Sequence, residues 1–362
     1  MTLSNKKAFK AAAVQASPVY YDLETSLQKA IKLVHEAASA GASLIVFPET
    51  YLPGYPFHIW LEPYGAWLGR TEAYYANCPT SDGPECKTLE ALAKSLDITI
   101  VMGCSEKDHG TLYMSQWIIA PEGLIAQRRK LKPSLMERVV FGEGDGSDIR
   151  VYDSRLGRIG ALNCWEHNVP LIKHVMACQH EEIHCASWPH LHDNMPHHSL
   201  GYSANTGSNR AYAIEVGTFV IMSTAPMSDA NATHICGDDP VKRGMLGTGG
   251  GCSMIFDPEG REIAERLEHD KEGLVYATID TGKCALAKSA LDTVGHYARG
   301  DVFQVIFNGK PRQPLELLQG QGQQRPYRQS RAEIFGKVAS VAGHAGSGRE
   351  LELGENNFMG GL

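Results

Sequence analysis

Short apolar runs alternate with amphipathic segments along the first fifty residues. Residues 9–15 are mostly small and apolar and predict a strand, and residues 43–47 predict a second strand that Pro48 ends. Between them, apolar residues recur at helical spacing over residues 25–40, which predicts a helix. A strand, a helix and a strand in this order indicate parallel pairing and a layered α/β structure.

The same rhythm continues to about residue 280. Helical spacing predicts further helices over residues 87–96, 171–179 and 205–217. Apolar runs predict further strands over residues 98–103, 112–120, 158–163, 182–187, 218–223, 252–257 and 273–279. No linker or shift in composition divides residues 7–300, so we expect one large domain rather than two.

The composition changes after Phe307. Residues 313–331 are rich in Gln, Arg, Pro and Gly, and the chain ends in GENNFMGGL. Such a segment does not build a core of its own. We therefore predict a domain over residues 1–307 and a C-terminal tail over residues 308–362, which contacts another subunit or is partly disordered.

Charge, the length of the apolar runs and the cysteine pattern limit the classes of partner and the cellular location that we expect. The 34 Lys and Arg residues are outnumbered by 41 Asp and Glu, and the pI is near 6.1, which argues against nucleic-acid binding. The longest apolar runs fall far short of the ~18 residues that cross a membrane. The nine cysteines include no CxxC pair, and the N-terminus lacks a signal-peptide pattern, so a disulfide framework is not expected. We expect a cytoplasmic protein without a membrane anchor.

Two segments place a reactive side chain just after a predicted strand, where open α/β sheets bind ligands. Glu49 follows residues 43–47; it is either a solvated carboxylate or, beside an apolar wall, a general base with a raised pKa. Cys164 follows residues 158–163 at a turn that resembles a nucleophile elbow. The alternative for Cys164 is a buried cysteine of the core.

A third segment, Arg-Arg-Lys-Leu-Lys-Pro-Ser at residues 128–134, concentrates four cations. Such a cluster is most often a solvated surface. The functional interpretation is that one lysine points inward and stabilises a developing negative charge.

Together these segments resemble the nitrilase branch of the carbon–nitrogen hydrolase superfamily. The sequences FPE, RRKLKPS and NCWEH occur in the order and approximate spacing of that family, and the resemblance extends over about residues 8–300. It implies a triad in which Glu49 is the base, Lys130 the cation and Cys164 the nucleophile. It also implies that Glu137 is a second carboxylate that helps to position the site.

The resemblance implies hydrolysis of an organic nitrile to a carboxylic acid and ammonia, through a thioimidate and an acyl-thioester on the cysteine, without a cofactor. The backbone N–H of Trp165 is a candidate to stabilise the tetrahedral intermediate. The candidate substrate-binding residues are Tyr51, Tyr55, Trp165, Trp188 and His190. Within the same branch, a cyanide hydratase or dihydratase is the nearest alternative.

The resemblance also implies an architecture and an assembly. The expected fold is a four-layer αββα sandwich, in which two sheets face each other between two layers of helices. The expected assembly is a homo-oligomer built from dimers, often a spiral or filament, with subunit contacts sought in the tail.

A competing motif, His-Glu-Glu-Ile-His at residues 180–184, matches the H-E-x-x-H pattern of zinc peptidases. That chemistry requires the segment to be a helix, and Pro189 soon follows. In a strand, His180 and His184 would lie ~13 Å apart, too far for one zinc ion. We therefore favour a scaffold role over a zinc hydrolase through His180 and His184, and expect no metal.

Overall fold

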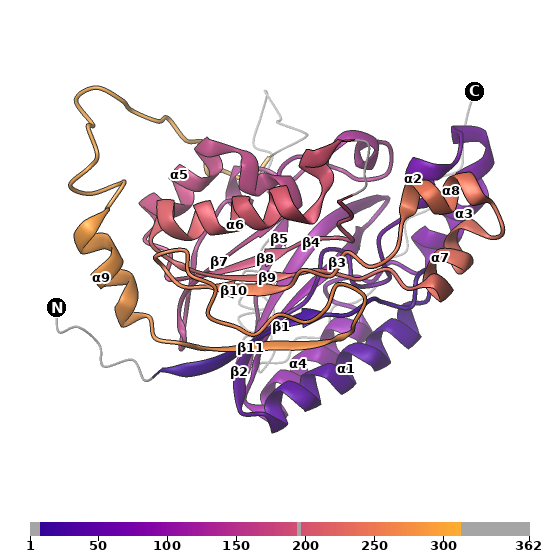
Figure 1. Ribbon diagram of the computed structural model, residues 1–362, viewed down its shortest axis with the longest axis horizontal. Coiled ribbons are helices and arrows are strands. Elements are labelled where there is room, and N and C mark those ends of the chain that lie inside the picture. Colours follow the sequence, from indigo (N-terminus) through magenta and orange to yellow (C-terminus); the bar gives the residue numbers. More distant parts are fainter. Residues whose placement is uncertain (1–7, 194–196, 313–362) are drawn as a thin grey trace, which may run out of the picture. The chain divides into compact units, whose positions relative to one another are not determined.

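The computed structural model describes residues 8–193 and 197–312 (Figure 1). The strands are β1 (Phe9–Gln15), β2 (Ala42–Val46), β3 (Thr99–Asp108), β4 (Thr111–Ala120), β5 (Gly123–Arg129), β6 (Tyr152–Ser154), β7 (Gly157–Asn163), β8 (Ile183–Ser187), β9 (Phe219–Ser223), β10 (Met254–Phe256) and β11 (Gly273–Ile279). The α-helices are α1 (Leu23–Ser39), α2 (His58–Leu61), α3 (Tyr64–Ala76), α4 (Pro84–Leu96), α5 (Pro170–Cys178), α6 (Tyr202–Val216), α7 (Asp229–Cys236), α8 (Pro240–Leu246) and α9 (Gly282–Ala290). The 3-10 helices are η1 (Leu135–Val139), η2 (Gly146–Asp148), η3 (Cys164–Asn168) and η4 (His198–Leu200).

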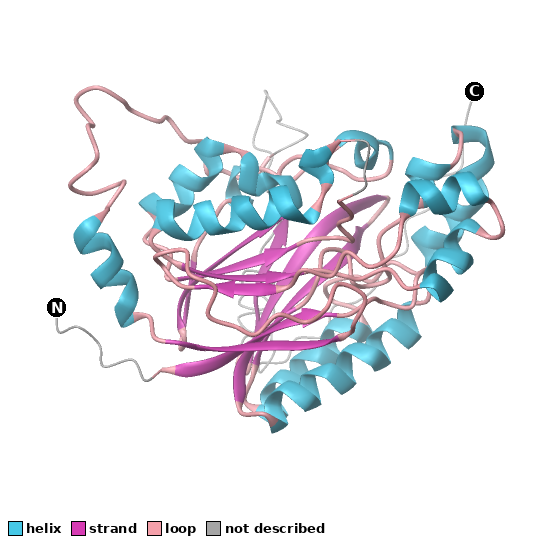
Figure 2. Cartoon of the chain, viewed as in Figure 1, coloured by secondary structure: helices cyan, strands magenta, loops and turns pink. Residues whose placement is uncertain are grey.

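The strands form two sheets. The first has the order β11-β1-β2-β3-β4-β5 and the second β10-β9-β8-β7-β6. The central strands β1, β2 and β3 pair in parallel, as do β7, β8 and β9. Parallel strands need crossover connections, and the helices α1, α4, α5 and α6 supply them. Figure 2 shows helices on both outer sides of the strands, which confirms the αββα sandwich.

Side chains alternate along β1, so this one short strand contributes to two hydrophobic clusters, one on each face of the sheet. Ala11 and Ala13 point into the cluster between the sheets, whereas Ala12 and Val14 belong to the cluster under α1 and α4. Successive side chains of a strand point to opposite faces. Because both faces are buried, the run is apolar throughout rather than alternating with polar residues.

Each helical layer buries one apolar stripe. Helix α1 buries Leu27, Ala30 and Val34 against the first sheet. Its N-terminus is capped by Asp22, whose carboxylate accepts from the N–H of Thr25 at 2.9 Å. Helices α5 and α6 cover the second sheet and contribute to a separate cluster on its outer face.

Several elements were not expected from the sequence. Strand β5 ends in three polar residues, Gln-Arg-Arg, yet it pairs with β4 and carries these side chains into the protein. The sequence analysis also missed α3, although Trp67 and Leu68 follow Tyr64 at helical spacing. The other elements that the sequence did not predict are β6, α2, α7, α8 and α9.

The described residues up to Gly309 belong to one compact unit. Nearly all of the tail predicted over residues 308–362 lies outside the described residues, so its role stays a prediction. No helix in the described ranges is long and apolar enough to cross a membrane.

Candidate active site

Glu49 is positioned where β2 ends. Its backbone N–H donates to the carbonyl of Trp188 at 3.2 Å, which links the end of the first sheet to the second. On its other side lies Gly103 of β3. A Cβ at Gly103 would be 1.9 Å from the carbonyl oxygen of Pro48, so only glycine lets β3 approach the backbone at Glu49 this closely.

Lys130 follows β5 and is buried, as are Arg128 and Arg129 before it. Its backbone N–H donates to Met114 on β4 at 2.7 Å, and its carbonyl accepts from Gly144 at 2.8 Å. The basic segment is therefore not a solvated cluster. Of its four cations, Lys132 alone is exposed.

Lys130 lies between two carboxylates. Its Nζ donates to Oε1 of Glu49 and to Oε2 of Glu137, both at 2.9 Å. Glu137 belongs to η1, where the backbone N–H of Ser134 donates to Oε2 at 2.5 Å, and the hydroxyl of Tyr55 donates to Oε1 at 2.8 Å. The sequence-predicted residues Glu49, Lys130 and Glu137 thus form one hydrogen-bonded cluster.

Cys164 lies at the turn from β7 into η3 and has a φ of +49°. Left-handed backbone is rare for residues other than glycine and is often found at functional sites. The backbone N–H of Trp165 acts on the Cys164 sulfur and lowers the pKa of the thiol. The turn thereby presents the sulfur and a backbone donor together, as the oxyanion role predicted for Trp165 requires.

Glu166, which the sequence analysis missed, joins the cysteine turn to the lysine segment. It forms a buried ion pair with Arg128 and accepts from the N–H of Leu131 at 2.7 Å and of Asn163 at 2.8 Å. Burial opposes its ionisation, but these donors hold its pKa below the usual range. The spacing Asn163-x-x-Glu166 is that of a capping box, and this is the signal that could have identified it.

The electrostatics of the cluster favour proton transfer. Burial raises the pKa of Glu49, and although Lys130 opposes this shift, Glu137 reinforces it. Burial alone would lower the pKa of Lys130, but the two carboxylates outweigh it and keep the ammonium charged. Burial also raises the pKa of the Cys164 thiol well above its ordinary value, against the opposing effect of Lys130. A base with a raised pKa is better matched to a neutral thiol than an ordinary carboxylate.

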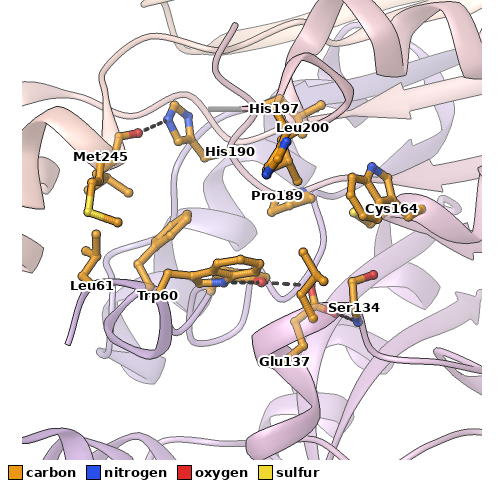
Figure 3. Close-up of a pocket in the computed structure, with 16 residues that line it drawn as sticks. Trp60, Leu61, Ser134, Glu137, Cys164, Pro189, His190, His197, Leu200 and Met245 are labelled. Atoms are coloured by element: carbon orange, nitrogen blue, oxygen red, sulfur yellow. Dashed lines mark hydrogen bonds between the residues drawn. The ribbon is translucent and has the colours of Figure 1, made fainter. Parts of the chain in front are cut away.

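A cavity of about 330 Å³ opens beside the cysteine (Figure 3). In this view Cys164 and Glu137 lie on one side, with Trp60 and Met245 across from them. Sixteen described residues line it: Tyr55, Phe57, Trp60, Leu61, Ser134, Leu135, Glu137, Cys164, Trp165, Pro189, His190, Leu191, His197, Leu200, Met245 and Leu246. A concave, mainly apolar site with a few converging polar groups is typical of small-molecule binding.

The comparisons with known proteins agree with this geometry. Residues 10–289 match the model of the carbon–nitrogen hydrolase family. The chain belongs to the carbon–nitrogen hydrolase family. The resemblance seen in the sequence is thereby confirmed.

Similar members of the family are named nitrilases. An aliphatic nitrilase of Rhodococcus rhodochrous is 43% identical over 310 residues, which cover 85% of this chain and 84% of the relative. An arylacetone-specific nitrilase of Alcaligenes faecalis is 40% identical over 317 residues, which cover 86% and 88%. These identities support the nitrilase branch of the family.

Solved structures support the family fold. The NitFhit protein of C. elegans matches with a TM-score of 0.65 at 18% identity, covering 85% of this chain and 69% of that one. A carbon–nitrogen hydrolase of Helicobacter pylori also has a TM-score of 0.65 at 18% identity, with coverages of 82% and 97%.

Two predicted substrate-binding residues do not line the cavity of this family member. Tyr51 packs edge-on against Phe47 at 5.0 Å in the core on the outer face of the first sheet. Trp188 is fully buried and stacks on His167 at 5.0 Å. An aromatic residue near a strand end packs equally well on the side facing away from the cavity, and both residues lie there in the structure.

The other predicted contacts lie in the cavity wall. Tyr55 and Trp165 line it, and so does His190, whose Nε2 donates to the carbonyl of Leu246 at 3.0 Å. The sequence analysis missed Phe57, Trp60 and Leu61, which follow directly after the Pro-Gly-Tyr-Pro segment at residues 53–56. The large apolar side chains just after this turn were the sequence feature that could have identified them as cavity residues.

The H-E-x-x-H segment is not the helix that zinc chemistry requires. His184 lies on strand β8, and its Nδ1 and Nε2 contact Glu181 and His167 at 2.7 and 2.9 Å. His180 lies in the preceding turn with a φ of +56°. Within residues 8–193 and 197–312, no group of three or more His, Cys, Asp or Glu residues is arranged to hold a metal ion.

The close approach at Gly103 allows a direct test of how Glu49 is positioned. We expect Gly103→Ala to lower the free energy of unfolding by about 2 kcal/mol, because the new Cβ meets backbone that cannot rotate away. We expect kcat to fall by about 100-fold, because displacing a catalytic group by ~1 Å has effects of this size. Denaturant unfolding and steady-state kinetics measure the two effects.

Gly110→Ala, at the turn between β3 and β4, is the matched control, since nothing lies within 4 Å of its added Cβ. Equal effects of the two substitutions on unfolding and kcat would show that the loss of a glycine in this hairpin, rather than the contact with Pro48, causes the change.

Proposed function

We propose that this protein hydrolyses organic nitriles to carboxylic acids and ammonia, with the thiol of Cys164 as nucleophile. The observation that supports this most directly is the cluster at the cavity: a cysteine on a strained turn, a backbone N–H on its sulfur, and a lysine held between two carboxylates. The identity with relatives named nitrilases supports the nitrile as substrate.

The first step forms a carbon–sulfur bond. Oε1 of Glu49 is occupied by Lys130, whereas Oε2 is buried and accepts no hydrogen bond from the described residues. Glu49 Oε2 takes the thiol proton while the sulfur of Cys164 attacks the nitrile carbon. The proton then passes to the nitrile nitrogen, which gives a neutral thioimidate.

The second step releases ammonia. Glu49 removes a proton from a water molecule that adds to the thioimidate carbon, and the nitrogen of the tetrahedral intermediate is protonated and leaves as ammonia. Lys130 and the N–H of Trp165 stabilise the charge that develops in this intermediate. A second water then cleaves the acyl-thioester to the carboxylic acid and restores the thiol of Cys164. Overall, one nitrile and two waters give one acid and one ammonia.

The cavity favours an organic nitrile over hydrogen cyanide. A volume of about 330 Å³ is far larger than a two-heavy-atom substrate requires. Trp60 and Met245 form the wall opposite Cys164. Burial of an apolar substituent of the substrate against these side chains would increase the substrate's affinity. The cyanide-degrading alternative would leave this surface without a function.

A panel of nitriles tests the substrate class. We expect ammonia from phenylacetonitrile, benzonitrile or an aliphatic dinitrile, and little loss of cyanide, because the apolar wall contributes binding energy only to organic substituents. Ammonia release and cyanide consumption are measured in parallel. Turnover of cyanide alone would assign the protein to the cyanide-degrading enzymes, and turnover of amides alone would refute nitrile hydrolysis.

We also propose a homo-oligomer built through the apolar C-terminal segment (residues 302–307). Five of its residues are large apolar side chains that are exposed in the single chain: Val302, Phe303, Val305, Ile306 and Phe307. Phe303 is 79% and Ile306 99% exposed. Contiguous apolar surface of this kind marks an interaction site, and we propose a second copy of this chain as the partner. The cytoplasmic location predicted from the sequence stays a prediction.

The double substitution Phe303→Glu with Ile306→Glu tests this interface. We expect smaller assemblies by light scattering after gel filtration, because charges at a buried contact are costly to desolvate. Val241→Glu, at another exposed apolar position, on α8, is the control. An unchanged mass for the double variant would place the subunit contact elsewhere.

A further inference from the structure

A chain of buried polar side chains runs behind the cysteine turn. His167 Nδ1 lies 2.6 Å from the carbonyl oxygen of Cys164, and its Nε2 lies 2.9 Å from Nε2 of His184. His184 Nδ1 lies 2.7 Å from Oε1 of Glu181, whose Oε2 accepts from the hydroxyl of Tyr212 at 2.7 Å. All four side chains are fully buried, and none lines the cavity.

The contacts and the burial of the two rings together indicate where the protons lie. A carbonyl oxygen only accepts, so Nδ1 of His167 carries a hydrogen. Burial holds the pKa of both His167 and His184 well below the usual range, so the rings are neutral. His167 Nε2 is then an acceptor, Nε2 of His184 must donate to it, and Nδ1 of His184 must accept.

The donor to His184 Nδ1 is therefore a protonated carboxyl group of Glu181. The electrostatics agree, because burial raises the pKa of Glu181 to about 8. The hydroxyl of Tyr212 donates to the other oxygen. Every hydrogen bond in the chain thus points in one direction, from Glu181 toward the Cys164 carbonyl.

The surroundings are built to hold this arrangement. A Cβ at Gly160 would lie 1.8 Å from Oε1 of Glu181, so glycine at this position gives the carboxyl group its place beside β7. The ring of His184 stacks on Tyr212 at 3.9 Å. The charged groups that act on the chain from neighbouring elements are Arg128, Glu166 and Lys288.

The chain ends on the peptide group that serves the nucleophile. The carbonyl of Cys164, which accepts from His167, and the N–H of Trp165 belong to the same peptide unit, and that N–H acts on the Cys164 sulfur and lowers the pKa of the thiol. A hydrogen bond accepted by a peptide carbonyl strengthens the bond that its N–H donates, and successive bonds reinforce one another.

We propose that Glu181, His184 and His167 are positioning residues that polarise the Cys164–Trp165 peptide and so strengthen the Trp165 N–H as donor to the thiolate and to the anionic intermediate. This role rests on the proposal that Cys164 is the nucleophile. It uses the histidine-rich segment that otherwise resembles a zinc motif, and it requires Glu181 to be a neutral acid rather than an anion.

Three variants separate polarisation from simple packing. Glu181→Gln keeps a donor toward His184 and an acceptor for Tyr212, whereas Glu181→Leu removes both. His167→Asn places an amide N–H near the position of Nδ1 but cuts the link to His184. All three are made in a Cys178→Ala background, because Cys178 is the exposed thiol.

The first measurement needs no nitrile. The rate at which iodoacetamide alkylates Cys164 is followed against pH by mass spectrometry. We expect the alkylation profile of Glu181→Gln to match that of the parent, and the profiles of Glu181→Leu and His167→Asn to shift to higher pH. For these two variants we also expect kcat for nitriles to be about 10-fold to 100-fold lower, with KM little changed. The effect should be smaller than the ~100-fold to 1,000-fold cost of losing a whole oxyanion donor. An infrared band of a protonated carboxyl group, present in the parent and absent in Glu181→Gln, reports the acid directly.

Two results would overturn the proposal. If Glu181→Leu and His167→Asn lower only thermal stability and leave the alkylation profile and kcat unchanged, the chain merely packs the core. If the infrared band is missing in the parent, or Glu181→Gln is as damaging as Glu181→Leu, Glu181 is ionised and the direction of the chain is wrong. Failure of nitrile turnover with a shifted alkylation profile would instead refute the proposed substrate and leave the polarised peptide standing.

Discussion

We expect the replacement of Cys164 by alanine to abolish ammonia release from nitriles while the protein stays folded. We expect a loss of at least about 10,000-fold in kcat, the size found when the nucleophile of a covalent mechanism is removed. The nitrile carbon is a weak electrophile, and water held at the same site lacks the polarisability that makes sulfur a strong nucleophile. The side chain is 8% exposed, and its removal leaves room beside an existing cavity rather than in a closed core.

Steady-state ammonia release measures the loss of activity, and far-UV circular dichroism tests whether the variant stays folded. Cys178→Ala, which removes an exposed thiol from α5, is the control and should keep full activity. The acyl-enzyme offers a second observation, because a mass increase on the peptide containing Cys164 should appear with a slow nitrile and be absent in Cys164→Ala. Ammonia release by the alanine variant above background would contradict a covalent mechanism at this residue.

The sequence predicted best those features that local chemistry determines. Strands β1 and β11 agree with the predicted ranges to the residue, because each is an apolar-rich run bounded by polar or turn residues. Glu49 and Cys164 were identified because each comes directly after such a strand. The side-chain cluster around Lys130 then follows from the fold, since the ends of β2, β5 and β7 meet at one place.

Features that depend on contacts distant in sequence were not predictable in this way. The local concentration of charge predicts that Arg128 and Arg129 lie on the surface. Both are buried because Arg128 pairs with Glu166, 38 residues away, and Arg129 pairs with Glu106, 23 residues away. A charge can be buried when it is paired, and pairing is a property of the fold. The same reasoning explains Trp188, which the sequence placed in the substrate pocket and the structure places against His167.

Replacing Lys130 by methionine is expected to damage both stability and activity. The methionine fills a similar volume, but Glu49 and Glu137 lose the cation that lies 2.9 Å from each of them. Breaking a buried pair by removing one partner costs about 3–5 kcal/mol, and the two carboxylates would also repel each other. Burial already raises the pKa of Glu49, and loss of the cation that opposes this shift would raise it further, so a smaller fraction of Glu49 would be ionised and able to accept the thiol proton. We expect kcat to fall by at least about 1,000-fold, since a charge-stabilising donor is lost and less of the base is ionised.

Two further substitutions separate the structural and catalytic contributions of Lys130. Adding Glu137→Gln to Lys130→Met removes one of the two unpaired carboxylates, so denaturant unfolding should show most of the stability restored while ammonia release stays low. Lys132→Met, two residues along the chain, is the matched control, because the side chain of this lysine is 55% exposed and pairs with Glu143 at the surface. Its effect on unfolding should stay within about 0.5 kcal/mol. If the double variant regained nitrile turnover together with its stability, Lys130 would serve only to compensate buried charge, and the stabilisation of the intermediate would fall to the backbone N–H of Trp165.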